Sequence, residues 1–223
     1  MKPTHTLDRR LTPDGKELIL YERDGVYTIR VDGQELMSSR AHGSEEALAR
    51  LTLDALDEAQ SPRVLVGGLG LGYTLRAALD LLPPGGAVVV AEVLPAVVAW
   101  NRGVRASLAG SPLSDPRVTL DEGDVIDLIQ VSPAAFDAVL LDVDNGPSAL
   151  TLAGNQRLYG PSGLDAVRRC LRPLGVLGVW SADPEPAFAR SLRHAGFEVR
   201  VESVFARGVR KGPRHTLFIA QRR

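Results

Sequence analysis

Three observations in the sequence predict an α/β fold built on one mostly parallel sheet. After Pro62, short apolar runs alternate with longer amphipathic segments. The runs are apolar throughout, as at 138–141, which is expected of strands that helices cover on both faces. The chain then ends in two β-rich segments, 197–202 and 215–220, with no helical segment between them. We predict a Rossmann-like sheet of seven strands that ends in an antiparallel hairpin, as in class I methyltransferase folds.

A small β unit is expected before that sheet. Residues 1 to about 15 are polar and contain proline, and we predict a mobile tail there. The segments 16–22 and 26–31 are rich in β-forming residues and flank an Arg-Asp-Gly turn, which predicts a hairpin. A second turn leads toward Leu36 and predicts a third strand. The expected units are a tail and β-hairpin unit over 1–40 and a nucleoside-binding domain over 44–223.

The first helix is expected to begin with Ser44 as its N-cap, because acidic Glu45 and Glu46 follow it, and to run to about Ala59. The remaining elements follow from the apolar periodicity of the chain. Strands are expected near 63–67, 87–92, 117–121, 137–142 and 174–180, and helices near 72–82, 94–108, 124–130, 162–171 and 185–195.

A glycine-rich turn is the strongest functional signal. Gly68, Gly70 and Gly72 lie between the predicted strand 63–67 and the helix that follows it. Glycine lacks a Cβ and tolerates positive φ, so a ligand can approach the main chain of such a turn closely. Glu92 ends the next strand, where a carboxylate can accept hydrogen bonds from ribose hydroxyls. Together they predict a bound nucleoside; the alternative is a turn that binds nothing.

The glycine spacing favours one kind of nucleoside. Dinucleotide sites usually have G-x-G-x-x-G, whereas this chain has G-x-G-x-G from Gly68 to Gly72. That spacing fits S-adenosylmethionine folds better than NAD folds. We therefore expect S-adenosylmethionine, or its decarboxylated form, as the cofactor.

Three further carboxylates are expected at the same edge of the sheet. Asp124 follows the third strand and is expected to accept from an adenine amino group, to cap the next helix, or both. Asp142 closes the fourth strand and is a candidate general base or orienting group for an acceptor, with Asp144 beside it. The alternative for both is bonding to the amides of the Asp-Asn-Gly-Pro turn. Trp180, at the end of the fifth strand, either walls the acceptor pocket or packs in the core.

Composition excludes several other classes of function. The net charge of −1 gives no electrostatic case for binding nucleic acid or an anionic membrane. No apolar run is long enough to cross a bilayer, and the first residues lack a signal peptide, so a cytoplasmic location is expected. The four histidines lack metal-ligand spacing, and the single cysteine, Cys170, is expected to be a buried reduced thiol. The cations at 206–214 are expected to form a solvated hairpin tip, with contact to an acidic substrate or nucleic acid as the alternative.

From about Ser44 onward, the order of motifs resembles that of the spermidine synthases. The stretch 68–72 with Leu75-Arg76 is similar to the family's Gly-Gly-Asp-Gly and following Leu-Arg. The segments 91–92, 115–118 with 123–124, and 137–142 with 146–147 are similar to its later motifs. The resemblance implies Glu92 on the ribose, Asp124 at the adenine, Asp142 on the amine, and oligomerisation through the N-terminal β unit, as a homodimer or larger.

The chain departs from that family where the amine substrates bind. Leu71 replaces the family's loop aspartate, which pairs with the amine of the decarboxylated donor, and Ser44 stands where the family has a tyrosine. The family's Asp-Ser-Ser-Asp-Pro motif is shortened to 142–145, and no Tyr-Pro-Ser-Gly-like loop appears near 205–214. Half of the carboxylate and aromatic groups that would grip a flexible cation are therefore missing.

Three functions remain open from the sequence. The first is a methyltransferase acting on a small amine or hydroxyl acceptor, with Asp142 and Asp144 as catalytic residues and Gly68, Gly70, Gly72, Glu92 and Asp124 holding the donor. The second is an aminopropyltransferase whose diamine is held by Asp142, Asp144 and Glu45 or Glu46. The third is a non-catalytic adenosyl-nucleoside binder or scaffold. A small-molecule acceptor is the expected partner, and no metal is expected.

Overall fold

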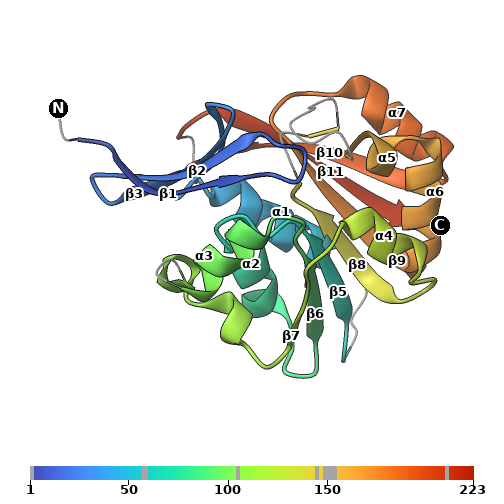
Figure 1. Cartoon of the computed structure of the whole chain (residues 1–223). Helices are drawn as coiled ribbons and strands as arrows, with labels where there is room; N and C mark the ends of the chain where they lie inside the picture. The colour runs from blue at the N-terminus through green and yellow to red at the C-terminus, as the bar shows by residue number, and fades with distance from the viewer. Residues whose placement is uncertain (1–2, 57–59, 104–105, 144–145, 148–154, 209–210) are drawn as a thin grey trace.

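The computed structural model describes residues 3–56, 60–103, 106–143, 146–147, 155–208 and 211–223. Two sheets organise the chain, one of four strands and one of seven (Figure 1). The four-stranded sheet projects from one end of the molecule and carries the N-terminus, and the C-terminus lies at the opposite end. The predicted α/β class and the separate N-terminal β unit are confirmed.

The N-terminal sheet is a meander of four antiparallel strands. Its strands are β1 (His5–Leu11), β2 (Glu17–Arg23), β3 (Val26–Val31) and β4 (Gln34–Ser38), paired in that order. The prediction of a mobile tail is wrong for residues 5–11, which pair with β2 from His5↔Glu22 to Leu11↔Glu17. Side-chain polarity misled the prediction, because β1 is an edge strand whose side chains are almost all exposed and need not be apolar.

The seven-stranded sheet has the order β10-β11-β9-β8-β5-β6-β7. Neighbouring strands from β9 to β7 are parallel, whereas β11 is antiparallel to both β9 and β10. The predicted terminal hairpin is thus confirmed. The strands are β5 (Arg63–Gly67), β6 (Ala87–Ala91), β7 (Val118–Asp121), β8 (Phe136–Leu141), β9 (Leu171–Ser181), β10 (Phe197–Phe205) and β11 (Arg214–Arg222).

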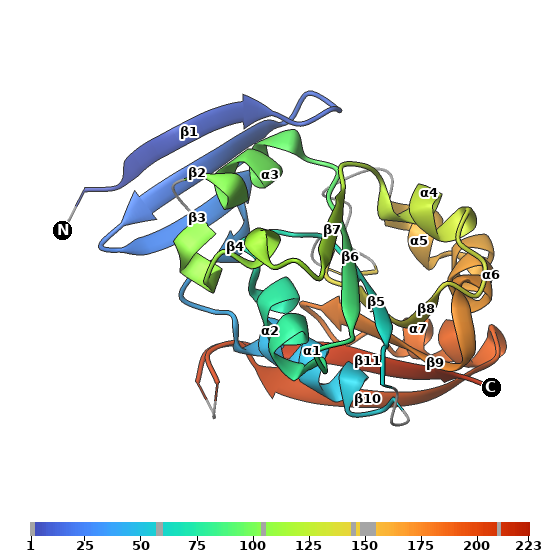
Figure 2. The same ribbon diagram turned by 90° about the horizontal axis from the view of Figure 1, so that it is seen from below.

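Helices cover both faces of this sheet (Figure 2). One face carries α1 (Gly43–Leu53), α2 (Tyr73–Leu81) and α3 (Pro95–Arg102), and the other carries α4 (Val125–Gln130), α5 (Asn155–Tyr159), α6 (Pro161–Cys170) and α7 (Pro186–His194). Short 3-10 turns follow α3 at Ala106–Ala109 and Pro112–Ser114.

Two helix boundaries differ from the prediction. The helix expected over 94–108 ends at Arg102, because Gly103 takes a non-helical conformation after it. The helix that was expected to have Ser44 as its N-cap begins two residues earlier, with His42 at the N-cap, and ends at Leu53 rather than near Ala59. Ser44 therefore lies inside α1, and its hydroxyl is available for another partner.

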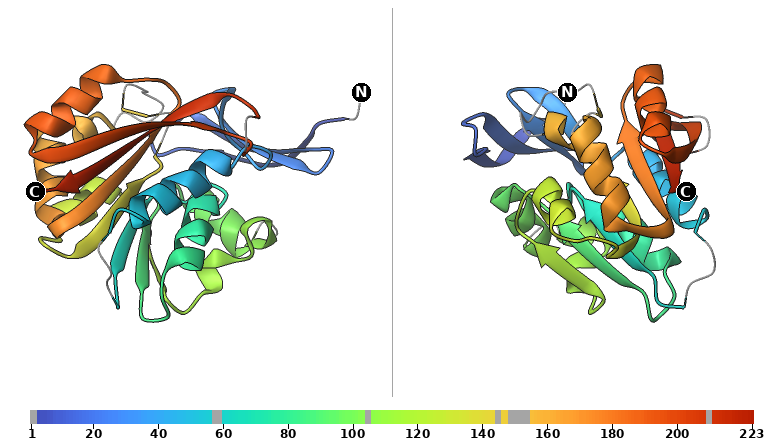
Figure 3. Two further views of the ribbon diagram at one scale, coloured as in Figure 1. Left: turned by 180° about the vertical axis from the view of Figure 1, so that it is seen from behind. Right: turned by 90° about the vertical axis from the view of Figure 1, so that its right-hand side faces the viewer.

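The N-terminal sheet shares a core with the larger sheet. Leu18, Leu20, Ile29 and Val31 are buried in the same apolar cluster as α1, α2 and α3. A second cluster fills the opposite face of the seven-stranded sheet, under α4 to α7. Cys170 is free and buried there, and burial raises the pKa of its thiol to about 12. Figure 3 shows the N-terminal sheet lying beside α3, near the loops that follow the parallel strands. That position brings β3 and β4 to the edge of the sheet where ligands of such folds bind.

Candidate active site

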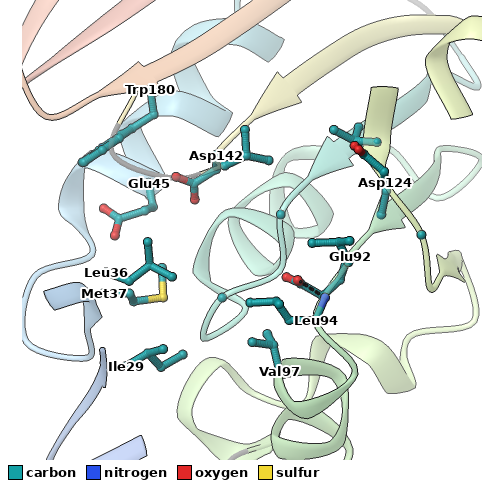
Figure 4. A pocket seen from close by; sticks show the side chains of 17 residues that line it. Ile29, Leu36, Met37, Glu45, Glu92, Leu94, Val97, Asp124, Asp142 and Trp180 are labelled. Atoms are coloured by element: carbon teal, nitrogen blue, oxygen red, sulfur yellow. Dashed lines mark hydrogen bonds between the residues drawn. The ribbon is translucent and has the colours of Figure 1, made fainter. Parts of the chain in front are cut away.

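A pocket opens at the carboxyl ends of the parallel strands, under the N-terminal sheet (Figure 4). It contains about 820 Å³ of space, including its open mouth. Its lining comprises the glycine loop, four carboxylates and a mostly apolar remainder: Ile29, Leu36, Met37, Glu45, Gly68, Gly70, Ala91, Glu92, Val93, Leu94, Val97, Gly123, Asp124, Val125, Asp142, Val143 and Trp180.

The polar groups of this pocket follow the order of the strands. Asp124 comes after β7 and Glu92 directly after β6, while the glycine loop follows β5. Asp142 comes after β8, and Trp180 lies near the end of β9. The parallel sheet therefore arranges residues that are distant in sequence into one row, from Asp124 at one end to Trp180 at the other. An elongated ligand along this row would meet them in turn.

The glycine loop is held against its neighbours so closely that side chains are excluded. Gly68 has φ +88°, and a Cβ there would collide with the carbonyl oxygen of Asp142. Gly70 has φ +51°, and a Cβ there would lie 2.6 Å from the sulfur of Met37. Glycine is therefore required at Gly68 by conformation and by space, whereas at Gly70 the positive φ favours it and a side chain would have to displace the end of Met37. Leu71, between Gly70 and Gly72, is 1% exposed and packs in the core rather than lining the pocket.

Glu92 joins the glycine loop to the start of α3. One carboxylate oxygen accepts from the Leu69 N–H at 2.9 Å, and the other accepts from the Leu94 N–H at 2.8 Å. Burial raises the pKa of Glu92, and these backbone hydrogen bonds oppose that rise. Each carboxylate oxygen has a second lone pair, so the group can still accept from a ligand hydroxyl.

Asp124 forms the N-cap of α4. Its Oδ1 accepts from the Ile126 N–H at 3.1 Å, and the residue also lines the pocket. The capping prediction is therefore confirmed, and the position of the carboxylate is compatible with the second, ligand-binding role.

Asp142 and Glu45 bring two carboxylates together at the far end of the row. Figure 4 shows both side chains below Trp180, and their charges interact. Thr74 of α2 donates its hydroxyl to Asp142 Oδ2 at 2.5 Å. Burial raises the pKa of Asp142 to about 6, and burial together with the charge of Asp142 raises the pKa of Glu45 to about 8. The pair therefore attracts a proton or another cation near neutral pH.

Glu45 is held in place by a buried hydroxyl. Ser44, which is fully buried, donates to Glu45 Oε2 at 2.6 Å, and its oxygen lies 2.8 Å from His215 Nδ1. The ring of His215 packs edge-on against Trp180, with centroids 4.6 Å apart. The buried indole N–H of Trp180 has no hydrogen-bond partner among the described residues. Two carboxylates and the ring of Trp180 thus border one region of the pocket.

The N-terminal sheet supplies an apolar wall opposite the glycine loop. Ile29 comes from β3, and Leu36 and Met37 come from β4. The Met37 sulfur accepts from the Leu71 N–H at 2.9 Å. This wall combines sequence segments that the strand pattern alone gave no reason to connect with the nucleoside site.

The predicted site residues Gly68, Gly70, Glu92, Asp124 and Asp142 all line this pocket, and Gly72 ends the loop as the residue before α2. Asp144 lies outside the described residues. Sequence reasoning did not find Met37, Thr74 or His215, and it considered Glu45 only as an alternative. An acidic residue in the first turn of a helix ordinarily indicates dipole stabilisation, so nothing local marked Glu45 as a pocket residue.

Within the described ranges, His, Cys, Asp and Glu side chains form no group of three or more suited to a metal ion. The helices of the same ranges are all too short or too polar to cross a membrane.

The strand order and the terminal hairpin together define a class I methyltransferase fold that carries an N-terminal β sheet. In particular, the architecture is like that of the spermidine synthases. The crystal structure of spermidine synthase from Thermotoga maritima matches with a TM-score of 0.80 and 18% identity, over 98% of this chain and 73% of that one. A spermidine synthase in complex with AdoDATO, a transition-state analogue, matches with a TM-score of 0.79 and 17% identity, over 98% and 72%.

A third similar structure is a probable spermidine synthase from Corynebacterium glutamicum, with a TM-score of 0.69 and 15% identity over 99% of this chain and 80% of that one. No family model matches the chain, and no curated protein sequence matches it. At these low sequence identities the similarity is a similarity of fold, and it extends over nearly the whole chain.

Proposed function

We propose that this protein transfers an aminopropyl group from decarboxylated S-adenosylmethionine to an amine. The observation that carries this proposal is the buried pair of Glu45 and Asp142 at the end of the row of polar groups. Two carboxylates with raised pKa beside an indole ring form a site for an ammonium group, which both charges and the aromatic face attract. The likeness in fold to spermidine synthases, one of them bound to a transition-state analogue, supports the same activity.

The row of polar groups suggests how the donor would lie. Asp124 would accept from the adenine amino group, and Glu92 would accept from the ribose hydroxyls with the lone pairs that Leu69 and Leu94 leave free. The glycine loop would lie under the sulfonium end. That orientation directs the transferable group toward Asp142, because β8 follows β5 in the sheet.

The chain's own residues would position the acceptor and take its proton. Asp142 would bind the acceptor amine and take its proton so that the nitrogen can attack, while Glu45 would pair with the amine of the donor. Thr74 would orient Asp142 through its hydroxyl, and Ser44 would orient Glu45. The bound sulfonium supplies a good leaving group: the new N–C bond forms as the C–S bond breaks, leaving a neutral thioether. Alignment of the reacting atoms then accounts for much of the catalysis.

Methyl transfer from S-adenosylmethionine is the second candidate, and Leu71 favours it. A carboxylate in the glycine loop would pair with the free amine of an aminopropyl donor, but Leu71 is apolar and buried in the core. Glu45, which faces the same pocket from α1, can take over that electrostatic role for the aminopropyl donor. This substitution of one carboxylate for another is the reason we place aminopropyl transfer first.

Calorimetric titration with the two donors tests the proposal. Tighter binding of decarboxylated S-adenosylmethionine, with release of methylthioadenosine when diamines or other primary amines are added, is expected. Tighter binding of S-adenosylmethionine would replace the proposal with methyl transfer. Binding of either donor without turnover of any amine would favour a non-catalytic adenosyl-nucleoside binder.

A further inference from the structure

Met37 lies where β4 crosses the glycine loop, and it is the side chain of the N-terminal sheet that contacts this loop most closely among the described residues. Its sulfur accepts from the Leu71 N–H at 2.9 Å and would lie 2.6 Å from a Cβ on Gly70. The thioether therefore covers the main chain between the second and third glycines of the loop, on the pocket side.

The backbone N–H groups of this loop are hydrogen-bonded, except that of Gly70, which faces the Glu92 carboxylate. The Gly68 N–H donates to the Ala91 carbonyl at 2.9 Å, and the Gly72 N–H donates to the Leu69 carbonyl at 2.7 Å. The Leu69 N–H donates to Glu92 Oε2 at 2.9 Å, and the Gly70 N–H faces the same carboxylate and lowers its pKa. The Leu71 N–H differs from these four, because its acceptor is a thioether, which is a weak hydrogen-bond acceptor.

A donor that carries a carboxylate would need an N–H group of this loop. Backbone N–H groups at a strand-to-helix turn are ready-made partners for an anion. Three of the other N–H groups are hydrogen-bonded and that of Gly70 faces the Glu92 carboxylate, so a carboxylate would have to reach the Leu71 N–H, and could do so only by displacing Met37. It would then also approach the negative charges of Glu45 and Asp142, which disfavour an anion and favour a cation.

We propose that Met37 is a specificity-determining residue, which disfavours donors with a carboxylate by capping the Leu71 N–H and filling the space over Gly70. This inference rests on the proposed function, because it concerns the choice between the two donors. The chain would then select its donor from both sides of the pocket: Met37 excludes the carboxylate, and Glu45 attracts the amine that remains.

Substituting Met37→Ala tests this proposal by binding alone, without an acceptor. Calorimetry would measure the dissociation constants of S-adenosylmethionine and of its decarboxylated form for the wild type and the variant. We expect the ratio of the first constant to the second to fall at least about fivefold in the variant, a change of about 1 kcal/mol. Leu36→Ala is the matched control, because Leu36 lines the same wall from the same strand. Its ratio should stay within about twofold of the wild type.

Met37→Val keeps an apolar residue suited to a strand but is too short to cap the Leu71 N–H or to fill the space over Gly70, so it gives the same test if the alanine variant does not fold. An unchanged ratio in the folded variants, with the wild type still preferring the decarboxylated donor, would overturn the role of Met37 and leave the proposed function standing. A wild type that prefers the carboxylated donor, or binds neither donor, would overturn the proposed function and this inference with it.

Discussion

Ser44 Oγ and His215 Nδ1 lie 2.8 Å apart although 171 residues separate them in the chain. The contact joins α1 to the first part of β11. The Ser44 hydroxyl also donates a hydrogen bond to Glu45 Oε2 at 2.6 Å. Burial lowers the pKa of His215, while the charge of Asp183 opposes that change. A neutral imidazole therefore holds the serine that orients a pocket carboxylate, and the orientation depends on packing between the two ends of the chain.

Removing the Ser44 hydroxyl should leave the Glu45 carboxylate without the hydrogen bond that holds its position. We expect Ser44→Ala to lower the free energy of unfolding by about 1–2 kcal/mol, because two buried polar groups lose a partner. Amine turnover should fall about tenfold as the carboxylate loses its fixed position. Urea denaturation and initial rates would measure the two effects. Ser191→Ala is the control, since its exposed hydroxyl bonds only its own helix at Ala187; equal effects from both variants would contradict the role of Ser44.

The free energy of unfolding of the Glu45→Gln variant should exceed that of the wild type by an amount that increases with pH. The pKa of Glu45 is about 8 in the folded protein and about 4.5 when the chain is unfolded. Between these values the folded state binds more protons than the unfolded state, so this group makes stability fall as the pH rises. Glutamine does not ionise and removes that loss.

The stability difference between Glu45→Gln and the wild type should therefore grow between pH 5 and pH 9, by on the order of 2 kcal/mol. Urea unfolding at three pH values in that range would measure it. Glu46→Gln is the control, because Glu46 is exposed and pairs with His42 at the surface. A difference that stays constant with pH would show that Glu45 is not buried as a carboxylate.

Asp142→Asn should separate catalysis from donor binding. Asparagine keeps the shape of the side chain and its acceptor for the Thr74 hydroxyl but cannot take a proton. We expect donor affinity to change by less than about twofold and turnover to fall by at least about 100-fold. Calorimetry and rate measurements on the same preparation would decide; unchanged turnover would exclude Asp142 as the base.

Thr74→Val should shift the pH dependence of turnover. The Thr74 hydroxyl donates to Asp142 and so lowers a pKa that burial otherwise raises, to about 6. Without the hydroxyl, the pKa of Asp142 rises further, and the acidic limb of the rate profile should move to higher pH. The pH–rate profile would show the shift, and Thr216→Val, on the neighbouring β11, provides the control for loss of a buried threonine hydroxyl. A profile that does not move would contradict the coupling of Thr74 to Asp142.

Glu92→Gln should weaken donor binding about tenfold or more, because one carboxylate oxygen becomes an N–H₂ donor that cannot accept from both the main chain and a ribose. The hydrogen bonds of Leu69 and Leu94 also lose strength. Calorimetric titration with both donors would measure the loss. Glu122→Gln changes an exposed carboxylate that pairs with Arg102, and it should leave donor affinity unchanged. Unchanged affinity in Glu92→Gln would contradict the proposed ribose contact.

The fold class and most of the row of polar groups could be predicted from the amino-acid sequence. Continuous apolar runs, the glycine turn and strand-end carboxylates are local signals, and parallel strands bring their carboxyl ends to one edge whatever the details of packing. Gly68, Glu92, Asp124 and Asp142 could therefore be assigned to one pocket from their positions after β5, β6, β7 and β8. Only β1 was missed among the strands, because exposed edge strands carry little apolar signal.

The side chains that face those groups could not be predicted, because tertiary packing brings them there. Met37 covers the glycine loop because the N-terminal sheet packs on the core beside α3, and Glu45 enters the pocket because α1 begins at Gly43 rather than after Ser44. His215 reaches Ser44 from the last strand. These contacts join distant segments through packing, which leaves no periodicity or spacing in the sequence, whereas the strand-end residues follow directly from the alternation of strands and helices.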